Sequence, residues 1–184
     1  SGKVVIELQF DDAFSFSEGL ARVEIDGKYG FIDKSGKMVI EPQFNNINDF
    51  SEGLAKVEKD GKWGFIDKNG KVVVEPQFDD AEPFSEGLAK VEKDGKYGFI
   101  DKNGKVVFEP QFDFVFDFSE GLALAEKDGK WGFIDKSGKV VVEPQFDWTG
   151  AFNDDAGAFS EGLARVEKDG KYGFIDKSGK VVIE

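Results

Sequence analysis

The segment Lys62-Trp63-Gly64-Phe65-Ile66-Asp67-Lys68-Asn69-Gly70-Lys71-Val72-Val73-Val74-Glu75-Pro76-Gln77-Phe78 recurs with small changes five times along the chain. The aromatic residue before its first glycine falls at Tyr29, Trp63, Tyr97, Trp131 and Tyr172, and subtraction gives spacings of 34, 34, 34 and 41 residues. A period of this length predicts a tandem repeat whose units pack on one another. We therefore expect one repeat domain over residues 1–184, with five units and a seven-residue insertion in the loop 147–158.

Each unit is expected to form a three-stranded antiparallel meander. In the second unit apolar and charged residues alternate, which predicts strands over Leu54–Lys59, Lys62–Asp67 and Lys71–Glu75. Pro76 has no N–H for a ladder, so it either ends the third strand or marks an exposed edge. Glycine or proline interrupts every stretch long enough for a helix, and the fold class is therefore all-β.

Two turn signals separate the strands of the second unit. Asp60-Gly61 is a two-residue hairpin signal between the first strand and the second. Lys68-Asn69-Gly70-Lys71 predicts a type I turn with Gly70 in the left-handed region. Asp67 and Asn69 also resemble the opening of a calcium loop, but the Glu that completes such a loop is missing, and turn chemistry explains these residues.

The expected sheets are apolar on both faces. Alternation places Trp63 and Phe65 on one face of the second strand, while Gly64 faces an aromatic of the next unit and valines occupy both faces of the third strand. The Phe residues that flank each loop between units are interpreted as wedges between sheets. Sheets covered on both faces by their own copies predict a five-bladed β-propeller-like ring, with a short extra strand before Phe-Ser-Glu-Gly-Leu; an open β-solenoid or superhelix is the alternative.

The two ends of the chain carry the same sequence. Ser178–Glu184 repeats Ser1–Glu7 letter for letter. A ring of five sheets has five positions for the third strand, whereas the chain offers six candidates. One end strand is therefore expected to be redundant, and the sequence does not say which of the two completes the last sheet.

Composition excludes several function classes. The chain has 37 acidic and 24 basic residues, and its net charge of −13 repels nucleic acid and anionic membrane surfaces. There is no cysteine and no histidine, which removes thiolate chemistry, the commonest general base and most transition-metal ligands. No apolar run approaches the roughly 20 residues of a membrane helix. We expect no enzyme activity, no catalytic or metal-binding residue, and no cofactor.

The repeated Lys-Trp-Gly-Phe-Ile-Asp and Phe-Ser-Glu-Gly-Leu motifs resemble the WG (KWG) β-repeats of bacterial proteins over nearly the whole chain. Tyr29, Tyr97 and Tyr172 depart from the pattern by replacing Trp, and Leu8 replaces Pro in the first unit. The resemblance implies an all-β repeat module with no established enzyme activity, and it transfers no site residue. It leaves the bacterial cytoplasm and the cell envelope or exterior both open.

The loops after each third strand differ between units, so they are the expected binding surface. The candidate residues are aromatic and acidic: Phe114, Phe116, Trp148, Phe152, Asp154 and Asp155. Exposed loop aromatics favour a protein or glycan ligand, although packing of Trp148 and Phe152 on the adjacent sheet is equally compatible. A monomeric scaffold that binds a protein or a glycan is the leading interpretation.

Two other functions stay open. One glutamate per unit precedes the Pro-Gln-Phe position, and together these could line an acidic rim of a carbohydrate-active or cation-dependent enzyme: Glu7, Glu41, Glu75, Glu109 and Glu143. Alternatively, these glutamates are solvated residues at strand ends. Catalysis by a pair of carboxylates needs two different environments, and the repetition gives these glutamates the same environment. The near-identical units also fit a designed or consensus protein without a biological function.

Overall fold

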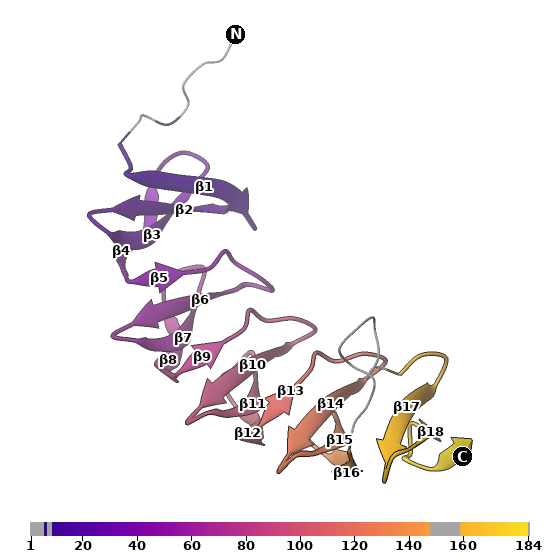
Figure 1. Cartoon of the computed structure of the whole chain (residues 1–184). Helices are drawn as coiled ribbons and strands as arrows, with labels where there is room; N and C mark the ends of the chain where they lie inside the picture. The colour runs from indigo at the N-terminus through magenta and orange to yellow at the C-terminus, as the bar shows by residue number, and fades with distance from the viewer. Residues whose placement is uncertain (1–5, 7–8, 148–158, 184) are drawn as a thin grey trace. The chain divides into compact units, whose positions relative to one another are not determined.

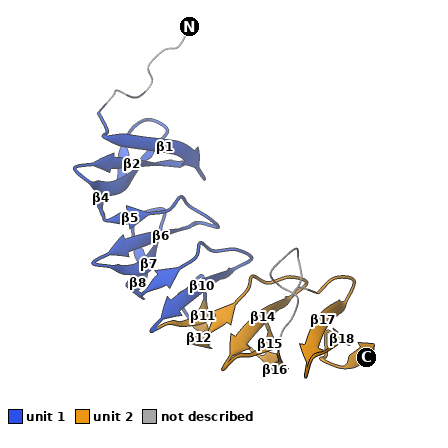
Figure 2. Ribbon diagram, in the orientation of Figure 1, with its two compact units in different colours: residues 1–94, 100–105 blue, residues 95–99, 106–184 orange. Residues whose placement is uncertain are grey.

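The computed structural model describes residue 6, residues 9–147 and residues 159–183, and the regular elements in this part of the chain are all β-strands (Figure 1). The chain divides into two compact units, residues 1–94 with 100–105 and residues 95–99 with 106–184 (Figure 2). No helix in the described ranges is long and apolar enough to cross a membrane. The all-β prediction is confirmed.

The nineteen strands repeat one pattern of lengths. They are β1 (Asp12–Ser17), β2 (Leu20–Ile25), β3 (Lys28–Asp33), β4 (Met38–Phe44), β5 (Asn46–Ile47), β6 (Leu54–Lys59), β7 (Lys62–Asp67), β8 (Val72–Phe78), β9 (Asp80–Ala81), β10 (Leu88–Lys93), β11 (Lys96–Asp101), β12 (Val106–Phe112), β13 (Phe114–Val115), β14 (Leu122–Lys127), β15 (Lys130–Asp135), β16 (Val140–Phe146), β17 (Leu163–Lys168), β18 (Lys171–Asp176) and β19 (Val181–Ile183).

These strands form small antiparallel sheets in which sequence neighbours are sheet neighbours. Unit 1 contains the sheets β1-β2-β3-β4 and β5-β6-β7-β8, and unit 2 contains β13-β14-β15-β16 and the three-stranded β17-β18-β19. Strands β9 to β12 have the order β12-β11-β10-β9 and include residues of both units. The meander is therefore confirmed, and β5, β9 and β13 are the predicted short extra strand. Closure of the sheets into a ring stays a prediction.

In the second repeat the observed strands and turns can be compared directly with those predicted from the sequence pattern. Strands β6 and β7 have the predicted bounds, and their register pairs Val57 with Gly64 and Glu58 with Trp63. Asp60 and Gly61 have φ of 53° and 75°, the two left-handed residues of a type I′ hairpin. Gly70 has φ of 79° and donates its N–H to the Asp67 carbonyl at 2.9 Å, as the turn prediction requires.

A second tight hairpin was not predicted. Glu52 and Gly53 have φ of 52° and 86°, and the backbones of Ser51 and Leu54 exchange two hydrogen bonds across them at 2.9 and 3.1 Å. This is again the geometry of a type I′ turn. Glutamate rarely adopts the left-handed region, so the Phe-Ser-Glu-Gly-Leu motif gives no standard hairpin signal.

The prediction that the third strand ends at Pro76 was wrong, because β8 runs through it to Phe78. The alternative of an exposed edge is confirmed, since β8 is the last strand of its sheet. The register passes from Trp63↔Phe78 to Phe65↔Val74, so β8 bulges around Pro76 where no ladder N–H is needed.

Gly64 lies beside this bulge, and not against an aromatic of the next repeat as expected. A Cβ atom on Gly64 would lie 2.4 Å from the Val74 carbonyl oxygen and 2.7 Å from the Pro76 nitrogen. The same close approach recurs at Gly30, Gly98 and Gly132. In these four repeats the glycine of the aromatic-Gly pair therefore lets the third strand of its own sheet fold inward.

Burial on both faces holds for the second strand of each repeat but not for the third. Phe65 and Ile66 point to opposite faces of β7 and are both fully buried. In β8, Val74 is buried whereas Val72 is exposed. The expectation of apolar cover on both faces of the third strand was wrong because β8 is an edge strand that sends only part of its side chains inward.

Phe residues join successive sheets, as the wedge interpretation predicts. Phe78 and Phe84 are buried in one cluster with Phe65 of the second repeat and with Val91 and Ile100 of the third. The rings of Phe65 and Phe84 lie 4.8 Å apart. In unit 2, Phe146 and Phe159 are likewise buried in one cluster.

A polar contact accompanies each wedge. In unit 1 the Glu18 carboxylate accepts a hydrogen bond from the Gly53 N–H at 3.1 Å and lies 2.9 Å from Lys68 Nζ. One repeat later, Glu52 makes the same contacts with Gly87 and Lys102, at 3.0 and 2.8 Å. Glu18 and Glu52, which both have a positive φ, thus each contact the corresponding turn of the following repeat.

Candidate binding surface

Four aromatic residues of unit 2 form a cluster, called here the Phe114 patch: Phe114 and Phe116 from the segment between the third and fourth repeats, Tyr97 from β11 and Trp131 from β15. Phe114 contacts the other three, with ring centroids 5.9 Å from Tyr97, 5.0 Å from Phe116 and 6.4 Å from Trp131. Phe116 and Trp131 lie 5.9 Å apart. The four side chains therefore form one continuous aromatic surface.

The exposure of these side chains decreases from the tip of the patch to its base. Phe114 is 39% exposed and Trp131 is 7% exposed. Phe116 is partly buried against the core cluster of unit 2. The structure thus brings together two of the predicted site residues, Phe114 as the exposed tip and Phe116 as a support. The other four, Trp148, Phe152, Asp154 and Asp155, lie outside the described residues.

Backbone pairing fixes the position of the tip. Phe114 lies opposite Glu126 and Val115 opposite Ala125 in the antiparallel β13–β14 pair. Glu126 in turn lies opposite Trp131 across β14 and β15. Phe114 and Trp131 are therefore on neighbouring ladders of one sheet, which is why their rings meet.

In other repeats a cation of the chain lies over the corresponding aromatic ring. Lys56 Nζ is 3.6 Å from the centroid of Trp63. The Arg22 guanidinium is 5.8 Å from the centroid of Tyr29, and that of Arg165 is 5.5 Å from Tyr172. The fourth repeat has Leu124 at this position, and Leu124 is buried. Trp131, the aromatic residue at this position of the fourth repeat, therefore has a buried leucine where Trp63 and Tyr172 have a lysine or an arginine.

Two sequence signals mark this difference, and only Phe114 is among the site residues predicted from the sequence. Leu124 stands where the other repeats have Arg22, Lys56, Lys90 and Arg165. Phe114 stands where they have Asp12, Asn46 and Asp80. Comparison of aligned copies inside one sequence would have found both residues without a structure.

Ion pairs border the patch. Asp113, next to Phe114, pairs with Lys96 and accepts the Asp128 N–H at 2.8 Å. The Lys96 side-chain hydrogen bond, with the Asp128 backbone bond, lowers the pKa of Asp113 below its usual range. Asp147 pairs with Lys130, and its pKa is lowered for the same reason. These carboxylates stay ionised, so the aromatic surface has a polar, charged border.

The other candidate sites resolve into turns and solvated residues. Glu41, Glu75, Glu109 and Glu143 are all exposed on their edge strands, and Glu7 lies outside the described residues. Asp67 Oδ1 accepts the N–H groups of Asn69 and Lys71 at 2.8 and 3.0 Å, which is turn chemistry. Within the described part of the chain no three acidic residues converge in a way that could hold a metal ion.

The repeats match a known family along the whole chain. The profile of the family described as WG containing repeat matches residues 1–29, 29–63, 63–97, 97–131, 131–172 and 172–184. Among curated proteins no sequence matches this chain. The six consecutive matches divide the chain at the aromatic-Gly pairs that define the period.

Several solved structures show a distant likeness. BamB from Moraxella catarrhalis is 14% identical with a TM-score of 0.44, over 89% of this chain and 69% of that chain. Kluyveromyces lactis Hsv2 is 11% identical with a TM-score of 0.41, over 90% of this chain and 59% of that one. PorZ from Porphyromonas gingivalis is 9% identical with a TM-score of 0.44, over 98% of this chain and 29% of that chain. The chain spans less than two thirds of Hsv2 and of PorZ, and likeness at this level carries no functional argument.

Proposed function

This chain belongs to the WG containing repeat family, and we propose that it works as a non-catalytic binding module that holds a basic segment of a partner protein at the Phe114 patch. The observation that carries the proposal is the replacement of the repeat's own cation by Leu124 under an exposed aromatic tip. A lysine or arginine of a partner can lie over the exposed ring of Phe114, in the way that Lys56 lies over Trp63 in the second repeat.

The energetics favour a cationic occupant. A cation over an aromatic ring contributes about 0.5–1 kcal/mol at an exposed site and about 2 when it is desolvated. The net charge of −13 raises the local concentration of basic partners and speeds their association. The bordering carboxylates of Asp113 and Asp147 add acceptors for a second basic residue. One patch of this size supports a weak, salt-sensitive interaction.

The proposal of a non-catalytic role rests on the residue inventory. Without histidine or cysteine, the chain would have to build an acid–base pair from carboxylates, tyrosines or lysines. The repeated glutamates Glu41, Glu75, Glu109 and Glu143 are alike in exposure, whereas such a pair needs two different environments. Hydrolysis of a glycan that Glu75→Gln abolished would contradict this role.

The test uses a matched substitution at one repeat position. Phe114→Asp gives the fourth repeat the residue that Asp12 and Asp80 supply elsewhere, and Asn46→Asp is the control at the same position of the second repeat. The probe is a short peptide of alternating arginine and serine, measured by isothermal titration calorimetry. We expect Phe114→Asp to weaken binding about tenfold, or about 1.4 kcal/mol, and Asn46→Asp to leave it unchanged.

Two further ligands separate the alternatives. The same peptide with citrulline in place of arginine keeps the shape and removes the charge, so it should bind poorly. Uncharged N-acetylglucosamine oligomers test the glycan interpretation. If these oligomers bind in a manner that Phe114→Asp abolishes while the arginine peptide does not bind, the patch recognises sugar rings and the proposed basic partner is wrong.

A further inference from the structure

One aromatic pair recurs at each junction between successive repeats. It joins the Phe of the second strand of one repeat to the Phe of the Phe-Ser-Glu-Gly-Leu turn of the next. The centroid distances are 4.7 Å for Phe31–Phe50, 4.8 Å for Phe65–Phe84, 5.1 Å for Phe99–Phe118 and 4.9 Å for Phe133–Phe159. Among the described residues, two phenylalanines of this series do not take part in such a pair. Phe16, in the first turn, is 43% exposed, and Phe174, in the last second strand, is 37% exposed.

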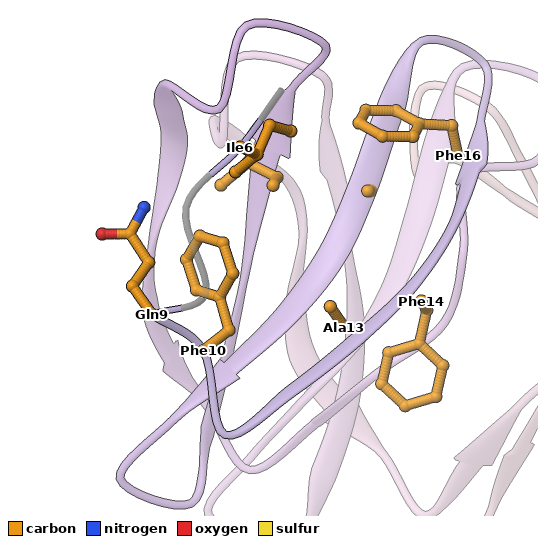
Figure 3. A pocket seen from close by; sticks show the side chains of 8 residues that line it. Ile6, Gln9, Phe10, Ala13, Phe14 and Phe16 are labelled. Atoms are coloured by element: carbon orange, nitrogen blue, oxygen red, sulfur yellow. The ribbon is translucent and has the colours of Figure 1, made fainter. Parts of the chain in front are cut away.

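The first sheet has a hollow beside Phe16. A cavity of about 230 Å³ is lined mainly by apolar side chains, among them Ile6, Phe10, Phe16 and Ile32 (Figure 3). Part of this face is already covered, because Ile6 lies 3.0 Å from the position of a Cβ atom on Gly36. The third strand of a preceding repeat makes this contact elsewhere, as Ile40 does at Gly70. At the other junctions, the first and second strands of the preceding repeat occupy the position of this hollow.

The last sheet exposes the groups that would fill such a hollow. Phe174 corresponds to Phe31, Phe65 and Phe133, which are all buried at their junctions. Ile183 is 53% exposed, whereas its counterpart Val142 is buried. Ile183 also occupies the place in Ser178–Glu184 that Ile6 occupies in Ser1–Glu7, so it can replace Ile6 on Gly36.

The polar contacts are complementary as well. In each described junction within a unit, the glutamate of one turn pairs with the lysine of the next repeat, as Glu18 does with Lys68 and Glu120 with Lys177, both at 2.9 Å. Within the described ranges, the first such lysine, Lys34, and the last such glutamate, Glu161, have no ion pair. The two leftover groups have opposite charges and lie at the positions that pair at the described junctions within a unit.

We propose that the open faces of the first and last sheets bind one another between two copies of this chain, head to tail. Phe174 of one copy packs on Phe16 of the next and fills the hollow, and Glu161 pairs with Lys34. Phe16 beside the hollow and Phe174 on the last sheet are each exposed within their own unit, and a second copy offers both the aromatic ring and the carboxylate that these positions pair with at other junctions. This proposal departs from the monomer expected from the sequence.

The test exploits the two different faces of this interface. Phe16→Glu blocks the first face and Phe174→Glu blocks the last, while Val72→Glu places the same charge at an equally exposed valine away from both. Sedimentation equilibrium should show a mass above the 20.4 kDa of one chain that rises with concentration for the wild type and for Val72→Glu. Each Phe variant alone should stay at the monomer mass. An equimolar mixture should form a dimer and nothing larger, because only one intact face of each kind remains.

A charge exchange tests the same contact without touching the apolar residues. Lys34→Glu and Glu161→Lys should each weaken association several-fold, and the double variant should restore it. Circular dichroism melts establish that every variant is folded. A wild type that stays monomeric over the whole concentration range, as it would if the two ends met within one chain, overturns the proposal. A mixture of the two Phe variants that remains monomeric overturns it too.

Discussion

The rings of Phe65 and Phe84 meet edge to face, 4.8 Å apart, and so link β7 of the second repeat to the turn of the third. Phe65 is fully buried in this contact. Phe65→Ala is expected to lower the free energy of unfolding by about 3–5 kcal/mol, because neighbouring sheets cannot collapse into the cavity. Urea unfolding measures the change. Phe174→Ala, at the same position of the half-exposed last repeat, serves as the control and should cost about 1 kcal/mol.

Gly64 is predicted to be intolerant of even a methyl group. A Cβ atom there would lie 2.4 Å from the backbone oxygen of Val74 in its own sheet, so β8 would have to move. Gly64→Ala should destabilise by about 1–3 kcal/mol through overpacking, measured as a lower midpoint of urea unfolding. Gly61→Ala is the control: its Cβ atom would meet open space, and its left-handed φ of 75° should cost about 1 kcal/mol. A milder effect at Gly64 than at Gly61 would contradict the close approach seen in the structure.

The sequence predicted the strands and turns that depend on local chemistry. Strands β6 and β7 and the left-handed Gly61 and Gly70 follow from alternation and from the few residues that tolerate those backbone angles. The bulge of β8 around Pro76 could not be found this way, because it depends on how Gly64 admits a backbone from its own sheet. Periodicity therefore sets the elements, while contacts between backbones set where they bend.

An acid-sensitive contact recurs at Asp79, Asp113 and Asp147. Each pairs with a lysine, whose hydrogen bond lowers the pKa of the carboxyl, and each also accepts a backbone N–H of the next hairpin. Because the pKa of each carboxyl is lower in the folded chain, the unfolded chain binds more protons than the folded chain at low pH. This contribution to stability is complete above the unfolded pKa of about 3.9 and is lost as the pH falls through the folded value.

Unfolding free energies at several pH values measure this effect. The wild type should lose stability between about pH 5 and pH 2, and Asp113→Asn should show a shallower loss over that range because its amide does not titrate. Asp12→Asn, whose carboxylate accepts only the adjacent Ala13 N–H, is the control and should follow the wild-type curve. An unchanged slope for Asp113→Asn would mean that this carboxylate contributes nothing to acid sensitivity.

The candidate site was only partly accessible to sequence reasoning. Differences between loops drew attention to Phe114 and Phe116, since variable segments alone make one repeat chemically distinct from another. That Phe116 supports the patch from the core, and that Leu124 is buried in one cluster with Trp131 whereas Lys56 lies over Trp63, depend on contacts across strands. Side chains far apart in sequence meet only when the register is known.

Leu124→Lys should give the fourth repeat its own cation and so compete with any basic partner. Lys56 shows that the site can hold such a side chain, with its stem covered and its Nζ 3.6 Å from the Trp63 centroid. We expect the variant to keep its circular dichroism spectrum while its affinity for the arginine peptide falls about tenfold, which calorimetry measures. Methionine is close to lysine in length but carries no charge, so Leu124→Met should bind the arginine peptide as the wild type does. If both variants bind the peptide equally well, an intramolecular cation does not compete for the Phe114 patch, and the partner's charge is recognised elsewhere.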